Sequence, residues 1–186
     1  MMKKIFIILM SIFTVTGCGG EKQNKMETQP SVIFEKEKEV QMKIKSPAFN
    51  DGGFIPANYT ADGEDISPPL EIEGVPEGAA TLVLIVDDPD APGGNWDHWI
   101  LWNIPATTAR IEAGTHPPCI KGRNDFGTLD YGGPAPPSGT HRYFFKLYAL
   151  DKKLELKEGT GKAALLKAME GHTLSTAVLI GKYSRH

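Results

Sequence analysis

Short apolar stretches, bounded by glycine, proline or polar residues, recur along the chain from residue 41 onward. Those at 42–44 and 70–73 alternate apolar and polar residues, as a half-buried strand does. The run TLVLIV at 81–86 is almost continuously apolar and rich in β-branched residues, which favours a central strand. Apolar or aromatic runs of the same kind follow at 99–104, 143–150 and 176–183. These patterns predict at least six strands.

One segment has the composition of a helix instead. Residues 161–170 combine alanine, leucine and methionine, which are strong helix formers, and Gly171 stands where such a helix would end. The stretch at 54–59 is predicted to be a loop. Six strands and one late helix within about 145 residues predict an all-β-dominated fold, and specifically a β-sandwich.

Composition and charge narrow the class of protein further. The 186 residues include 20 glycines and 14 prolines, a content that suits a turn-rich β fold. With 40% hydrophobic and 23% charged residues, full-length disorder, collagen and coiled coil are excluded. The formal net charge is −3, so the chain lacks a basic footprint and we predict no nucleic-acid partner.

The N-terminus has the features of a bacterial lipoprotein signal. Lys3 and Lys4 precede an apolar stretch at 5–15, which is too short for the roughly 20 residues that span a bilayer. The run VTGC at 15–18 resembles a lipobox, in which cleavage precedes a lipid-modified cysteine, here Cys18. The alternative is an ordinary signal peptide with an incidental cysteine. Several acyl chains on one cysteine would hold the protein firmly at a membrane.

These features divide the chain into three parts. We predict a signal peptide at 1–17, a lipidated cysteine with a flexible tether at 18–40, and a folded domain at 41–186. A short solvated helix at 35–40 is the alternative for the end of the tether. The predicted location is the bacterial cell envelope, at the outer membrane if the host is Gram-negative.

Three polar clusters interrupt the apolar pattern. The run DDPDAP at 87–92 follows a predicted strand, WDHW at 96–99 starts another, and the loop at 132–139 leads into the HRY run at 141–143. A solvated Asp-Pro turn and a core histidine are the plain alternatives for the first two. In a strand, His141 and Tyr143 share one face and Arg142 takes the other.

Together these clusters suggest a small polar pocket flanked by rigid loops. Histidine and tyrosine donate to anionic oxygens, and the aspartates would receive a cation, which suits a phosphate or a zwitterion. The chain has no GxSxG, HExxH, Walker A or GxGxxG motif. If imidazolium attracts the ligand, affinity for anions should rise as the pH falls through about 6.5.

These runs resemble the motifs of the phosphatidylethanolamine-binding protein (PEBP) family, most closely its bacterial Raf kinase inhibitor-like branch (YbhB/YbcL type). The run DPDAP at 88–92, the pair HW at 98–99 and GTHRY at 139–143 stand in the family's order. Supporting runs are FIP at 54–56, ISPPL at 66–70, KGRNDFG at 121–127 and YGGP at 131–134. The resemblance extends over residues 42–183.

The resemblance implies two packed antiparallel sheets with Greek-key character, a peripheral C-terminal helix and a small pocket for phosphate-like anions. It implies these ligand-binding residues: Asp88, Asp90, His98, Pro136, Pro137, His141 and Tyr143. It also places Trp96 beside the histidine and Tyr131 at the entrance, and favours a cis bond between Ala91 and Pro92.

Two positions depart from the family pattern. Ala135 stands where the bacterial branch often has a cysteine, which removes thiol chemistry there. Asp97 stands where the eukaryotic branch has a second histidine, which we expect to make the pocket rim more acidic.

We therefore expect a non-enzymatic protein that binds a small anionic or zwitterionic ligand, with no cofactor, metal or catalytic residue. A protein-interaction or inhibitor module that uses the pocket rim is the alternative. A metal-assisted hydrolase is the third reading, because aspartate and histidine are acceptable zinc ligands.

Overall fold

The computed structural model describes residues 41–185, which form eight strands, one α-helix and one short 3-10 helix. The strands form two antiparallel sheets and the helix lies toward the C-terminus, so the predicted fold class is confirmed. The predicted signal peptide, Cys18 and the tether lie outside these residues. No helix within 41–185 is long and apolar enough to cross a membrane.

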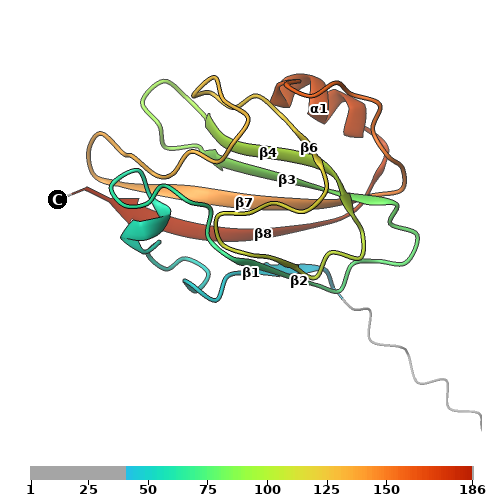
Figure 1. Ribbon diagram of the computed structural model, residues 1–186, viewed down its shortest axis with the longest axis horizontal. Coiled ribbons are helices and arrows are strands. Elements are labelled where there is room, and N and C mark those ends of the chain that lie inside the picture. Colours follow the sequence, from blue (N-terminus) through green and yellow to red (C-terminus); the bar gives the residue numbers. More distant parts are fainter. Residues whose placement is uncertain (1–40, 186) are drawn as a thin grey trace, which may run out of the picture. The chain divides into compact units, whose positions relative to one another are not determined.

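The larger sheet has five strands in the order β6-β4-β3-β7-β8 (Figure 1). Their bounds are Ile120–Lys121 (β6), Trp96–Pro105 (β4), Thr81–Asp88 (β3), Thr140–Leu150 (β7) and Thr173–Ser184 (β8). After β6 the chain returns, so that β7 lies beside β3, which is a Greek-key relation. All eight residues of β3 are buried, as its almost continuous apolar run predicted.

The smaller sheet has three strands in the order β1-β2-β5. Their bounds are Lys43–Lys45 (β1), Leu70–Glu73 (β2) and Arg110–Ile111 (β5). The alternation in β1 and β2 places Ile44, Leu70 and Ile72 in the main hydrophobic core, together with Leu84 and Phe145 of the larger sheet. The core between the two sheets is therefore built from one face of each.

Helix α1 (Lys162–Met169) covers the other face of the larger sheet. Leu165 and Met169 lie one helical turn apart and pack with Val83 and Ile100 in a second core cluster. Figure 1 shows α1 beside β4 and β6. The helix predicted at 161–170 is confirmed to within one residue at each end.

Three short elements were not predicted. Strands β5 and β6 have two residues each, and the 3-10 helix η1 (Ala57–Tyr59) lies in the predicted loop. Two or three residues are too few to show a period. Strands β4 and β7 also begin earlier than their apolar runs, so the polar clusters at 96–98 and 140–142 belong to strands.

The cis bond expected between Ala91 and Pro92 is absent, because every peptide bond of residues 41–185 is trans. The chain reverses here through a hydrogen-bonded turn that needs no cis bond. The Gly94 N–H donates to the Ala91 carbonyl at 2.9 Å, and Gly94 has φ +101°, a conformation that glycine adopts without steric cost.

Candidate functional site

A cavity of about 220 Å³ opens where β3 ends and β4 and β7 begin. It is lined by Asp88, Ala91, Pro92, Trp96, His98, Phe126, Ala135, Pro136, Pro137, His141 and Tyr143. Six of the seven predicted ligand-binding residues are therefore brought together, from positions up to 55 residues apart in the chain. The seventh, Asp90, does not line the cavity.

A bulge in β4 brings His98 to the cavity. Val86 of β3 pairs with Trp99, and the next residue, Asp87, pairs with Asp97, which leaves His98 without a partner on β3. Strict alternation would put His98 and Trp99 on opposite faces. Instead, Trp99 packs in the core between the sheets and His98 lines the cavity on that same side, because a bulge re-aims side chains.

The His98 ring is buried and held by the loop that follows β6. Its Nδ1 lies 2.6 Å from the carbonyl oxygen of Gly132, which can only accept, so Nδ1 carries a hydrogen. Nε2 remains for a ligand. Burial lowers the pKa of His98 below its usual 6.5, so protonation moves to a more acidic range than the sequence suggested.

Asp88 orients His141. Its Oδ2 lies 2.7 Å from Nδ1 of His141, and its Oδ1 accepts the Asp90 N–H at 2.8 Å. Both side chains are buried. Each carboxylate oxygen of Asp88 therefore has one partner within the protein, and His141 keeps Nε2 for the cavity.

The hydroxyl of Tyr143 is buried, and its hydrogen has no acceptor among residues 41–185. The backbone N–H of Ala135 is directed at its oxygen. The Tyr143 ring meets the His98 ring edge to face, with centroids 5.2 Å apart. Burial raises the pKa of Tyr143 well above its usual value, so the phenol keeps its proton and can donate. His141 and Tyr143 share one face of β7 and Arg142 points to the other, as predicted.

Asp90 binds a protein side chain and does not face the cavity. Arg142 donates to both of its oxygens, from Nη2 at 2.7 Å and from Nε at 2.8 Å. This pair lowers the pKa of Asp90 to about 2. Asp90 therefore ties the turn at 89–95 to the start of β7.

Two further expectations are also corrected. Asp97 does not make the rim acidic, because it is only 8% exposed and its carboxylate binds Lys162. Tyr131 does not line the cavity. Its hydroxyl donates to the Tyr59 carbonyl at 3.0 Å and its ring packs edge to face on Trp99.

The loop between β6 and β7 contributes two residues that sequence reasoning missed. Phe126 lines the cavity, with its ring centroid 5.3 Å from that of His98 and 5.5 Å from that of Trp96. Asn124 is buried and donates to the carbonyls of His98 at 3.1 Å and Asp130 at 2.8 Å. The only sequence signal for both was the family-like run KGRNDFG, since the loop has no hydrophobic period.

The free polar groups of the cavity are two imidazole nitrogens and one phenol. Within residues 41–185, no three His, Cys, Asp or Glu side chains are placed to hold a metal ion. Neither Ser138 nor Cys119 is among the residues that line the cavity. The phenol can donate to an oxyanion. A cavity-facing Nε2 donates in the imidazolium form, because Nδ1 already holds the hydrogen of the neutral ring.

Comparison with known proteins identifies relatives over the whole described domain. The profile of the phosphatidylethanolamine-binding protein family matches residues 45–184. A UPF0098 protein from Methanothermobacter thermautotrophicus is 55% identical over 150 residues, which cover 77% of this chain and 99% of the relative. One from Pyrococcus horikoshii is 41% identical over 197 residues, covering 99% of this chain and 91% of the relative.

Two solved structures share the fold. A putative phosphatidylethanolamine-binding protein homolog from Chlamydia trachomatis superposes with a TM-score of 0.77 at 41% identity, covering 79% of this chain and 99% of that one. E. coli YbcL, described as a member of the mammalian PEBP family, gives a TM-score of 0.74 at 30% identity, with coverages of 78% and 99%.

Proposed function

The chain belongs to the phosphatidylethanolamine-binding protein family, and we propose that its cavity binds the phosphate group of a small anionic or zwitterionic ligand without converting it. The Tyr143 hydroxyl carries this proposal. It is buried, its hydrogen lacks an acceptor among residues 41–185, and Tyr143 lines the cavity together with His98 and His141. A buried hydroxyl left unpaired costs about 1–3 kcal/mol, which an accepting phosphate oxygen would recover.

The walls of the cavity limit the size of the ligand. Pro136 and Pro137 form a rigid side, and Trp96 and Phe126 stand at the exposed rim. Pockets for drug-sized ligands measure about 300–1,000 Å³. At about 220 Å³, this cavity fits a phosphate or a phosphorylated head group, with any larger organic part lying outside against the aromatic rim.

Substitution of Tyr143 by phenylalanine tests this assignment. Tyr143→Phe removes one hydrogen bond to the anion, so we expect affinity for inorganic phosphate to fall about tenfold or more. Tyr148→Phe is the matched control, because Tyr148 lies on the same strand but on the opposite face. Calorimetric titration measures both. Equal phosphate affinities in the two variants would remove Tyr143 from the site.

A second candidate function is a protein-interaction module at the rim. Trp96 is 38% exposed and Phe126 is 45% exposed at the mouth of the cavity, and aromatic residues are enriched at interfaces. This alternative would be supported if the wild-type protein bound no phosphate and a Trp96→Ala variant lost binding to a protein partner. Asp88 and Asp90, two of the residues on which the metal-assisted hydrolase alternative depends, bind His141 and Arg142.

We further propose that Cys18 anchors the domain to a bacterial envelope membrane through covalent lipid. The support is the lipobox-like run at 15–18 behind a charged and then apolar leader. Cells fed a labelled palmitate analogue should incorporate label into the wild-type protein and not into a Cys18→Ala variant. Equal labelling of both would contradict the anchor.

A further inference from the structure

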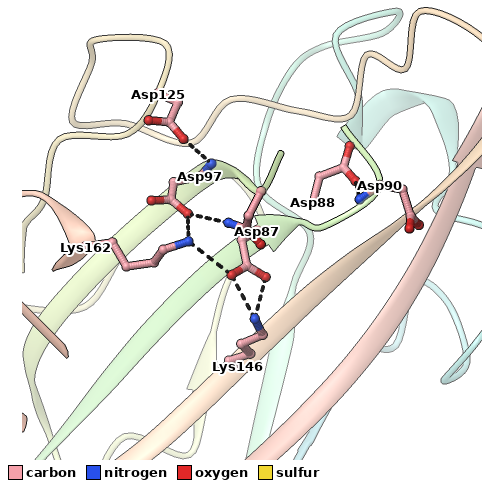
Figure 2. A network of polar contacts seen from close by, with 8 residues as sticks. Asp87, Asp88, Asp90, Asp97, Asp125, Lys146 and Lys162 are labelled. Carbon is pink, nitrogen blue, oxygen red and sulfur yellow. Dashed lines mark hydrogen bonds and ion pairs between the residues drawn. The ribbon is translucent and has the colours of Figure 1, made fainter. Parts of the chain in front are cut away.

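Charged side chains lie behind the cavity, on the other face of the larger sheet. Asp87 and Asp97 pair across β3 and β4, and each directly adjoins a cavity residue in the sequence, Asp88 or His98. Both contact cations from the side of the sheet that α1 covers. Figure 2 shows the four residues that we name the outer-face cluster: Asp87, Asp97, Lys146 and Lys162.

The cluster contains two carboxylates and two ammonium groups. Lys162, the first residue of α1, binds Oδ1 of Asp97 and lies 3.4 Å from Oδ2 of Asp87. Lys146 of β7 lies 2.8 Å from both oxygens of Asp87. Because Asp87 is 2% exposed and Asp97 is 8% exposed, solvent screens these charges weakly.

Lys162 is the cation on which Asp97 depends. Within residues 41–185, Asp97 forms its only ion pair with Lys162. Its other contacts are neutral or anionic: Asn95 donates to Oδ1 at 3.0 Å, and the Asp97 backbone N–H donates to Asp125 at 2.7 Å. Burial raises the pKa of Asp97, and the ammonium of Lys162 acts against that rise.

We propose that Lys162 is a positioning residue for the cavity on the opposite face. It compensates the carboxylate of Asp97, the residue before His98 in β4, and so sets the pH range in which the cavity takes up an anion. The proposal rests on the proposed function, because the anion is the ligand assigned above. It also gives α1 a role in ligand binding, although no residue of α1 lines the cavity.

The charges around His98 come from four elements. These groups are Asp87 and Asp88 of β3, Asp97 of β4, His141, Tyr143 and Lys146 of β7, and Lys162 of α1. The loop after β6 adds the Gly132 carbonyl, the Phe126 ring and Asp125, whose carboxylate lies beside Asp97. Burial lowers the pKa of His98, and the carboxylates of Asp88, Asp87 and Asp97 raise it. Removing Lys162 takes away a positive charge that compensates Asp87 and Asp97, so the negative charge felt by His98 increases.

The test is an NMR titration of the His98 imidazole in the full chain. Lys162→Met should move its midpoint upward by about 0.5 pH unit, and Asp97→Asn should move it downward. General loosening of the fold cannot produce shifts of opposite sign. Lys162→Arg keeps the charge and should leave the midpoint in place. Lys45→Met, which removes a lysine paired with Glu73 in the smaller sheet, should do the same.

Sulfate titrations at each pH separate this proposal from the proposed function, because sulfate keeps its charge across the range. In Lys162→Met, sulfate binding should persist to higher pH than in the wild type. In Asp97→Asn, it should be confined to lower pH than in the wild type. Unchanged His98 midpoints in both variants would overturn the role of Lys162, even if the wild type binds sulfate. Shifted midpoints without sulfate binding in any variant would contradict the proposed function while supporting the coupling between Lys162 and His98.

Discussion

The double variant His98→Ala/His141→Ala is expected to bind inorganic phosphate at least about 100-fold more weakly than the wild type. Each imidazole offers one Nε2 to the cavity, and a hydrogen bond to a charged group contributes about 1.5–3 kcal/mol. The loss of two such bonds therefore exceeds about 3 kcal/mol, and each 1.4 kcal/mol is about a factor of ten. Calorimetric titration of both proteins at the same pH measures the difference.

His172→Ala is the matched control for this loss. His172 is half-buried, pairs with Asp151 at 2.9 Å and does not line the cavity, so its removal should leave phosphate affinity unchanged. Near-ultraviolet circular dichroism of the double variant checks that the core still packs. Phosphate affinity within about threefold of the wild type, in a folded double variant, would contradict the assignment of the two histidines.

Replacement of Phe145 by alanine should have the largest effect on stability. Phe145 is fully buried between the sheets, with its ring centroid 5.8 Å from that of Phe49. Removing a buried phenylalanine ring destabilises a protein by about 3–5 kcal/mol, because apolar burial is lost and a cavity remains. The free energy of unfolding, measured by urea denaturation, should fall by that amount.

Phe54→Ala makes the same chemical change at the surface. Phe54 is 61% exposed, so its loss should change the free energy of unfolding by no more than about 0.5 kcal/mol. If both phenylalanine variants lost similar stability, Phe145 would not be the core residue that the fold makes it. The comparison also concerns the cavity, because β7 carries Phe145 together with His141 and Tyr143.

The main strands and the helix could be predicted because each is long enough to show its period. The run at 81–86 is apolar at nearly every position, since β3 is buried on both faces by the smaller sheet and by α1. Strands β5 and β6 have two residues each and owe their existence to their partners, β2 and β4. Their sequences alone carry no such information.

The sequence predicted most of the residues that gather at the site, but it did not predict how each of them is positioned or what it contacts. The family-like motifs gave six of the residues that line the cavity. They did not give the bulge that turns His98 inward, because a bulge depends on the register between β3 and β4. Asp90 looked like a ligand-binding residue because its partner, Arg142, lies 52 positions away and reaches it only in the folded chain.

The outer-face cluster depends in the same way on strand pairing. Asp97 stood out in the sequence as a departure from the family pattern, and its effect was expected at the rim. The contact with Lys162 joins residues 65 positions apart and places the charge on the opposite face. Long-range ion pairs of this kind follow from register and helix docking, which a single sequence does not reveal.

Calorimetric titration of the wild-type protein with inorganic phosphate and with phosphoethanolamine tests the central claim most directly. We predict a saturable heat for both ligands that fits one site per chain, with phosphoethanolamine competing for the phosphate site. Absence of saturable heat for both ligands at millimolar concentration would contradict an anion-binding cavity.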